Sequence, residues 1–234
     1  AGPDEYLRRL GTLPLIAQPG ERWLYHIGID IAGILVARIA GTGFGAFLRE
    51  RLFAPLGMED TGFRIEAADA TQLASLYADA GGGRFIPMPS HAPTAPPPFE
   101  HGGSGLISTA SDLARFGRML LDGGVFQGHR ILSEAAVSEM RRDQISARAK
   151  AASPVFPGFW ENHGWGLGLC TVTAANPVSP QPGRFGWWGG TGTALFMDPA
   201  ADAVMVMLSQ RMIGDISDSA NADALIHAVL AEAG

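Results

Sequence analysis

Two short segments of the chain hold the residue types with the most chemical potential. Near the start, Tyr25 follows a Pro-Gly-Glu-Arg-Trp-Leu run at 19–24. A tyrosine phenol can shuttle a proton when a nearby cation or hydrogen-bond donor stabilises its deprotonated form. Near the end, segment 186–193 reads Gly-Trp-Trp-Gly-Gly-Thr-Gly-Thr, and its glycines let a ligand approach the backbone closely. Together the segments predict a site that combines acid–base chemistry with backbone hydrogen-bond donors.

In this order, the two segments resemble the second and third motifs of the serine β-lactamase and penicillin-binding-protein-like superfamily, and most of all those of its carboxylesterase branch. Two further strings, at 55–63 and 102–109, also resemble segments of this family. The resemblance implies an α+β fold of the β-lactamase/transpeptidase type, with a helical lobe, an antiparallel sheet and a C-terminal helix. It also implies serine attack on an ester or amide carbonyl through an acyl-enzyme.

The first motif of the family, Ser-x-x-Lys, does not occur in this sequence, although in the family it carries the nucleophilic serine. The only lysine is Lys150, and Ala147 stands three positions before it. We therefore expect the nucleophile to lie outside these 234 residues, so that the fold is incomplete at the N-terminus and the chain inactive by itself. A complementary N-terminal segment, or a self-associated dimer, would then cover the sheet edge and apolar surface left open.

The resemblance implies roles for particular residues. Tyr25 matches the tyrosine that passes a proton to the leaving group. Trp187, Trp188, Gly189 and Gly190 match the strand edge that faces the substrate. Within that edge, the Gly190 N–H would belong to the oxyanion hole, and Trp187 would line the acyl or alcohol pocket.

Two departures from the β-lactamase pattern favour ester substrates. Ile27 stands where β-lactamases keep an asparagine, and Trp187 stands where they keep a lysine. The carboxylate of a β-lactam or a D-alanyl peptide gains about 1.5–3 kcal/mol from a charged partner, which an apolar ester does not need. Arg184 or Arg211 would restore the charge if either lay close by. Carboxylic ester hydrolysis is thus the leading hypothesis; a β-lactamase or D-Ala-D-Ala carboxypeptidase and a non-catalytic binding or scaffold module are the alternatives.

Structural roles compete with these functional ones. Tyr25 could be a tyrosine at a helix start that packs on Trp23, and the third motif could be an edge strand with a glycine bulge. Ser104 lies in a Gly-Ser-Gly string, but Leu106 breaks the Gly-x-Ser-x-Gly elbow. A Ser/His/Asp triad with His101 stays open. No ligand spacing relates the other histidines, which are His26, His91, His129, His163 and His227.

Composition narrows the class of protein. The chain is 47% hydrophobic and 17% charged, which suits one large core. A formal net charge of −6 without a basic cluster gives no basis for nucleic-acid binding. Cys170 is the only cysteine, so neither an internal disulfide nor a Cys/His metal site is expected, and no cofactor is implied. No apolar run reaches the length of a membrane span, and localisation stays open.

Apolar periodicity and turn residues predict the elements that position these groups. We expect a helical lobe with cleft-rim loops over 1–160, and the sheet strands with the C-terminal helix over 161–234, both parts of one hydrolase domain. The expected helices cover 27–40 (a buried helix), 44–57, 109–123, 133–142 and the chain after about 219. A long Pro- and Gly-rich loop is expected over 79–100, and an antiparallel strand pair at 194–197 and 203–208, with Met205 and Met207 in the core.

Overall fold

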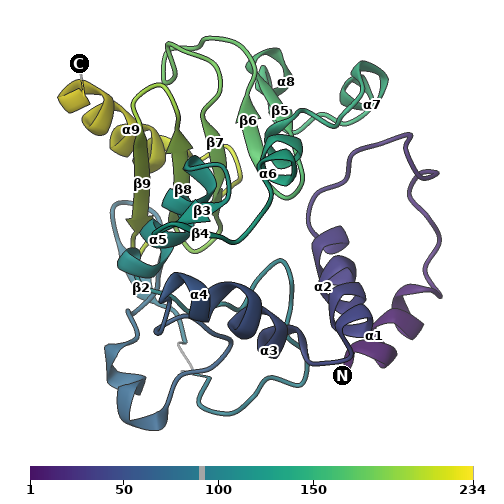
Figure 1. The fold of residues 1–234 in the computed structure, drawn as a ribbon. Helices are drawn as coiled ribbons and strands as arrows, with labels where there is room; N and C mark the ends of the chain where they lie inside the picture. Colours follow the sequence, from purple (N-terminus) through teal and green to yellow (C-terminus); the bar gives the residue numbers. More distant parts are fainter. Residues whose placement is uncertain (90–92, 234) are drawn as a thin grey trace.

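The computed structural model describes residues 1–89 and 93–233. His91 and part of the predicted loop 79–100 fall outside the described residues. The centre of the fold is a five-stranded antiparallel sheet in which each strand pairs with the next one along the chain. The strands, visible in Figure 1, are β5 (His163–Trp165), β6 (Cys170–Val172), β7 (Phe185–Gly189), β8 (Thr193–Asp198) and β9 (Ala203–Leu208). The predicted antiparallel pair is therefore β8 with β9.

Successive side chains of β8 point to opposite faces of the sheet, and both faces are apolar. Leu195 and Met197 lie against α5 (Ala110–Leu121), where a Cβ at Gly117 would meet both of their side chains. Ala194 and Phe196 belong instead to the core beneath α9 (Ala220–Ala233). The sheet is thus the middle layer between two helices, and the predicted α+β class is confirmed.

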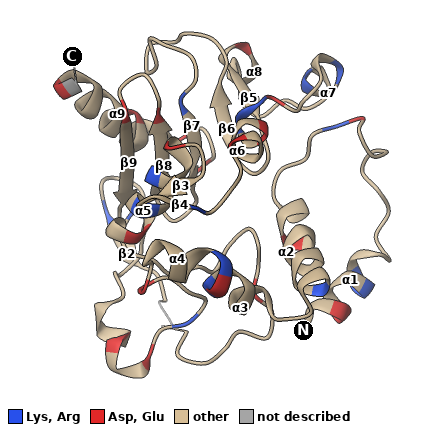
Figure 2. Cartoon of the chain, in the orientation of Figure 1, with Lys and Arg blue, Asp and Glu red and all other residues tan. Residues whose placement is uncertain are grey.

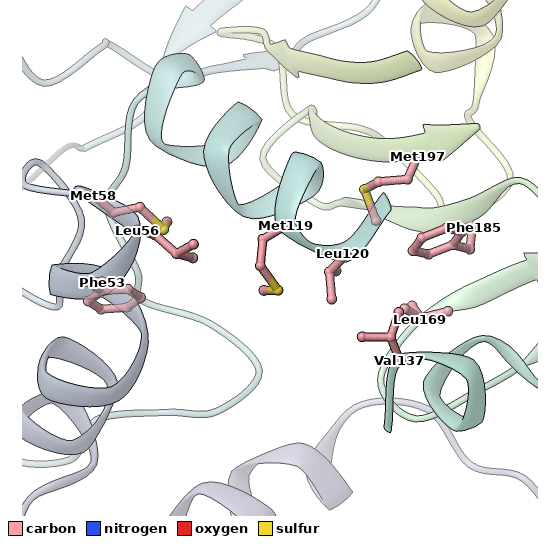
Figure 3. Close-up of a cluster of buried hydrophobic side chains, with 9 residues drawn as sticks. All are labelled: Phe53, Leu56, Met58, Met119, Leu120, Val137, Leu169, Phe185 and Met197. Atoms are coloured by element: carbon pink, nitrogen blue, oxygen red, sulfur yellow. The ribbon is translucent and has the colours of Figure 1, made fainter. Parts of the chain in front are cut away.

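The main core joins the helical lobe to the sheet, as Figure 3 shows. Its buried side chains come from the helices before residue 60, from α5 and α6 (Glu134–Arg141), and from the sheet side. Burial of each such side chain contributes about 1.5–3 kcal/mol. The cluster consists of Phe53, Leu56, Met58, Met119, Leu120, Val137, Leu169, Phe185 and Met197.

The predicted starts of two helices are confirmed by their N-terminal caps. The Thr109 hydroxyl accepts a hydrogen bond from the Asp112 N–H at the start of α5, and Ser133 caps α6 through the Ala136 N–H. The segment predicted as one helix over 44–57 consists of α3 (Phe44–Leu48), a π-helical turn η1 (Arg49–Phe53) and α4 (Ala54–Leu56). The remaining elements are α1 (Pro3–Leu10), η2 (Ala67–Gln72), α7 (Ala147–Ala151), α8 (Phe159–Asn162), and the hairpins β1 (Tyr77–Asp79) with β2 (Phe85–Pro87) and β3 (Val125–Phe126) with β4 (His129–Arg130).

Helix α2 (Ile27–Ala40) differs from the prediction in one respect. It ends as expected at Gly41, whose φ is +67°, but it is not a buried helix. Only Asp30, Gly33 and Ile34 are buried, whereas apolar residues elsewhere on the helix are exposed, up to 79% at Ile39. The reason is that α2 meets the rest of the protein along one side, where Gly33 lies against Phe44 and Gly102. The spacing of apolar residues in the sequence identified the helix, but it did not show which other segments pack against it.

In Figure 2 the acidic and basic residues are interspersed along the chain rather than gathered over one element. Within the described residues, no single helix is long and apolar enough to cross a membrane; α2 and the segment Phe44–Leu56, bent by 77° from each other, pass that test only together. The division of the domain near residue 160 stays a prediction. The five-stranded sheet begins at His163.

Candidate active site

The two predicted motifs meet in space. Tyr25 lies two residues before α2 and is 46% exposed, while Trp187 lies on β7. The Trp187 Nε1–H donates a hydrogen bond of 2.8 Å to the Tyr25 phenol oxygen, and the two ring centroids are 5.9 Å apart. Trp187 therefore contacts Tyr25 as a neutral hydrogen-bond donor.

Further aromatic rings extend this contact into a continuous surface. Trp165 lies 4.6 Å from Trp187 and 5.7 Å from Tyr25, measured between ring centroids. Trp23 lies 4.9 Å from Trp165 and 5.4 Å from Trp160. The Tyr25 ring packs on Trp23 at 5.8 Å between centroids, as expected if Tyr25 had only a structural role. Tyr25 also accepts the hydrogen bond from Trp187, which such a role does not require. We call the five rings of Trp23, Tyr25, Trp160, Trp165 and Trp187 the aromatic wall.

A buried serine holds the Tyr25 segment in place. Ser153 is only 6% exposed, and its hydroxyl accepts the Trp23 N–H at 2.8 Å. Its carbonyl accepts the indole N–H of Trp160 at 2.6 Å. Ser153, Trp160 and Trp165 were not predicted as site residues. The only sequence signal for them was the aromatic and glycine-rich composition of 159–168, which did not indicate a partner.

The glycine edge has the geometry of an accessible backbone donor. β7 ends at Gly189, which pairs with Thr193, and Gly190 follows in the exposed turn. The Gly190 carbonyl accepts the Ile213 N–H at 3.1 Å, whereas its own N–H donates to no acceptor within the described part of the protein. The turn depends on Gly192, where φ is +74° and a Cβ would lie 2.0 Å from the Arg211 carbonyl oxygen. A free amide at a strand end can stabilise an oxyanion.

Trp188 has a different position from its neighbour. Its indole N–H donates to the Ile216 carbonyl at 3.2 Å, and its ring packs against the core beneath α9. The ring also stacks on Trp187 at 4.1 Å between centroids. Trp188 therefore buttresses Trp187 from the other side of the strand and directs its polar atom away from Tyr25.

The nearby cations are engaged elsewhere. Arg211 pairs with Asp218 at 3.4 Å and Asp79 at 3.7 Å. Lys150 pairs with Asp143 and lies under Trp160 as a cation–π partner. Arg184 is buried on the α9 side of the sheet and donates to a backbone carbonyl. Among the described residues, none of these three cations donates a hydrogen bond to Tyr25, so the phenol has an indole donor in place of a charge.

A Ser/His/Asp triad is only half formed. His101 Nδ1 lies 3.4 Å from Asp30 Oδ2, and the Gly103 N–H donates to the other carboxylate oxygen at 3.0 Å. Burial by itself raises the pKa of Asp30, but the Gly103 donor and the His101 ring outweigh it, and the pKa is lowered. Ser104 is exposed and makes no hydrogen bond to His101 in the described residues. The Asp30–His101 pair thus links α2 to the loop beside it.

The described residues contain no cluster of three or more His, Cys, Asp or Glu side chains that could hold a metal ion. Cys170 is buried in β6, and burial raises the pKa of its thiol to about 12. A thiol with this pKa stays protonated at neutral pH and is a poor nucleophile.

Comparison with solved structures identifies the class of fold. EstCE1, a hydrolase with promiscuous acyltransferase activity, matches with a TM-score of 0.80 at 23% identity, over 98% of this chain and 61% of that one. The fold is therefore of the β-lactamase/transpeptidase type, as the sequence predicted. The Beta-lactamase family model matches residues 1–230, and the chain belongs to this hydrolase family.

Relatives within the family include esterases. Protein Rv1367c of Mycobacterium tuberculosis is 38% identical over 219 residues, which cover 89% of this chain and 54% of that protein. Esterase EstB of Burkholderia gladioli is 29% identical over 227 residues, covering 88% of this chain and 54% of EstB. The chain thus spans about half the length of these curated relatives.

Proposed function

We propose that these residues supply the proton-shuttling tyrosine and the oxyanion edge of a serine hydrolase that cleaves carboxylic esters through an acyl-serine intermediate. The observation that carries the proposal is the 2.8 Å hydrogen bond from Trp187 Nε1 to the Tyr25 oxygen, beside the free Gly190 N–H. The nucleophilic serine would come from a Ser-x-x-Lys segment outside this chain, and the chain alone would be inactive.

In the proposed reaction, the serine oxygen attacks the ester carbonyl, its proton passes to the lysine of the external Ser-x-x-Lys segment, and the Gly190 N–H stabilises the oxyanion. As the carbon–oxygen bond to the leaving alcohol breaks, the alcohol takes a proton from Tyr25. The resulting phenolate is stabilised by the Trp187 donor, and it takes a proton from the water that attacks the acyl-enzyme, while the lysine returns its proton to the serine oxygen as the acid leaves. Both halves of the reaction use the same phenol.

An ester suits this site better than a β-lactam or a D-alanyl peptide. The aromatic wall presents apolar surface, and of the cations considered, Lys150 and Arg211 are paired with carboxylates and Arg184 is buried on the α9 side of the sheet. A substrate carboxylate would have no charged partner there, and charge-assisted hydrogen bonds contribute about 1.5–3 kcal/mol. The names of Esterase EstB and of Lovastatin esterase, 30% identical over 80% of this chain, support the same choice.

The absence of a nucleophile from this chain is tested by intact mass after exposure to a fluorophosphonate, which labels activated serines. An unchanged mass is expected. A stoichiometric adduct would locate an activated serine within these residues, with Ser104 the first position to map, and would overturn an external nucleophile.

Ester hydrolysis is tested in a chimera that joins this chain to the Ser-x-x-Lys segment of a family member. We expect faster turnover of 4-nitrophenyl butyrate than of a chromogenic cephalosporin. Tyr25→Phe should lower kcat by about 10²–10⁴-fold, as loss of a general acid–base group does. A preference for the cephalosporin would support the β-lactamase alternative instead, and a Tyr25→Phe chimera of full activity would contradict the role of Tyr25.

A further inference from the structure

Arg184 is a buried cation with little to pair with. It immediately precedes β7, is 5% exposed, and makes one hydrogen bond, from Nη1 to the Val178 carbonyl at 2.9 Å. A guanidinium has five N–H donors. Among the described residues, no carboxylate lies within 4.0 Å of it. Burial lowers the pKa of Arg184, because a charge removed from water loses its hydration.

The side chain of Arg184 lines a hollow of about 320 Å³ on the α9 side of the sheet, away from Tyr25. The floor is formed by the sheet residues Val172, Gly186 and Phe196, and Phe156 and Ile226 complete an apolar lining. Gly186 has no room for a side chain, since its φ is +144° and a Cβ there would lie 2.1 Å from the Leu195 carbonyl oxygen. The hollow therefore combines apolar walls with one unpaired cation.

The other titratable groups that line the hollow are two carboxylates, a histidine and the buried thiol of Cys170, and the buried Asp198 also acts on Arg184 from beyond ion-pair distance. Asp223 lies at the first turns of α9 and accepts the Ser219 hydroxyl at 2.7 Å, and Glu161 is exposed at the rim. Burial lowers the pKa of His163, which favours its neutral form, and its Nδ1 faces the Phe159 carbonyl at 3.2 Å. Arg184 is thus the only cation among the residues that line this hollow in the described structure.

We propose that this hollow binds a small monocarboxylate with an apolar tail. The carboxylate would accept the remaining Arg184 N–H donors in the planar geometry that a guanidinium favours, and the tail would lie on Phe156, Val172 and Phe196. The ligand would restore the partner that the buried cation lacks. The hollow contains none of the five aromatic-wall residues, and among the described residues its lining contacts the wall through Phe159 and Trp188, so it is a second site, distinct from the one proposed for ester cleavage.

The test is isothermal titration of the full chain with sodium hexanoate, with hexanamide as the neutral probe of similar shape. We expect one hexanoate per chain and at least tenfold weaker binding of hexanamide. Tyr25→Phe should leave hexanoate binding unchanged, because this residue belongs to the other site. Equal binding of the two probes, or loss of binding in Tyr25→Phe, would overturn the proposal.

Two substitutions test the position of the carboxylate. Arg184→Met should weaken hexanoate binding at least tenfold, with Arg184→Lys weakening it less. If Arg184→Met does not fold, Asp223→Asn is the second test, since it removes a negative charge from the same hollow while keeping the side-chain shape. It should tighten hexanoate binding by about twofold to tenfold and leave hexanamide unaffected. Unchanged or weaker hexanoate binding in Asp223→Asn would place the carboxylate elsewhere and overturn the proposal.

Discussion

The Trp187 indole donates a 2.8 Å hydrogen bond to the Tyr25 phenol across a sequence separation of 162 residues. A tryptophan at this position cannot supply the positive charge of a lysine, but it supplies a donor of fixed direction, since its ring is held by Trp165 and Trp188. Such a donor stabilises negative charge on the phenol oxygen only when the proton leaves. Under the proposed function, Trp187 would therefore act on the Tyr25 phenol as well as form part of the aromatic wall.

Replacing Trp187 by Phe should lower the rate of ester hydrolysis by the chimera by about 3–10-fold, because one net hydrogen bond contributes about 0.5–1.5 kcal/mol. The aromatic ring and its packing are retained. The measurement is kcat for 4-nitrophenyl butyrate. Trp188→Phe is the comparison variant: it keeps an aromatic ring beside Trp187 but loses the bond to Ile216, and it should lower kcat less than Trp187→Phe does. Equal losses in both variants would contradict a specific role for the Trp187 donor.

Ser153→Ala should destabilise the chain by about 1–3 kcal/mol, because the Trp23 N–H loses its acceptor in a partly buried place. The measurement is urea unfolding followed by tryptophan fluorescence. Ser104→Ala replaces an exposed serine and should change the free energy of unfolding by less than about 0.5 kcal/mol. If Ser153→Ala were as stable as Ser104→Ala, Ser153 would not anchor the Tyr25 segment.

The lowered pKa of Asp30 predicts a specific pH dependence. Because the folded-state pKa lies below the unfolded value of about 3.9, this carboxylate contributes stability above about pH 4 and loses it as the pH falls through the folded pKa. Asp30→Asn should lower the free energy of unfolding at pH 7 by about 1–3 kcal/mol and flatten its decline below pH 4. Asp4→Asn, at an ion pair on the surface, is the control and should leave the profile close to that of the unmodified chain. If the free energy of unfolding of Asp30→Asn fell below pH 4 as steeply as that of the unmodified chain, the Asp30 carboxylate would not be the source of this pH dependence.

The exposed apolar face of α2 predicts self-association of the isolated chain. Leu35 is 55% exposed and Ile39 79% exposed, on the same helix as other uncovered isoleucines. Leu35→Glu with Ile39→Glu should reduce the average mass in light scattering toward that of a monomer. Ile16→Glu changes an equally exposed residue in the loop before α2 and should have a smaller effect. A monodisperse monomer before any substitution would contradict the prediction.

Sequence alone determined the local features of this protein. The caps at Thr109 and Ser133, the end of α2 at Gly41 and the β8–β9 pair all depend on hydrogen bonds or alternation within a few residues. The motif strings around Tyr25 and Trp187 identified the family, which the match over residues 1–230 confirms. Their roles in the site stay predictions.

Only the tertiary structure decided which faces and side chains meet. It brought the Trp187 donor to Tyr25, turned Trp188 toward Ile216, and left Arg184 buried with no ion-paired carboxylate among residues 1–89 and 93–233. It also left the apolar face of α2 exposed, although the sequence predicted a buried helix. The physical reason is that periodicity records which residues share a face of one element, whereas the partner of that face depends on packing between segments that lie far apart in the chain.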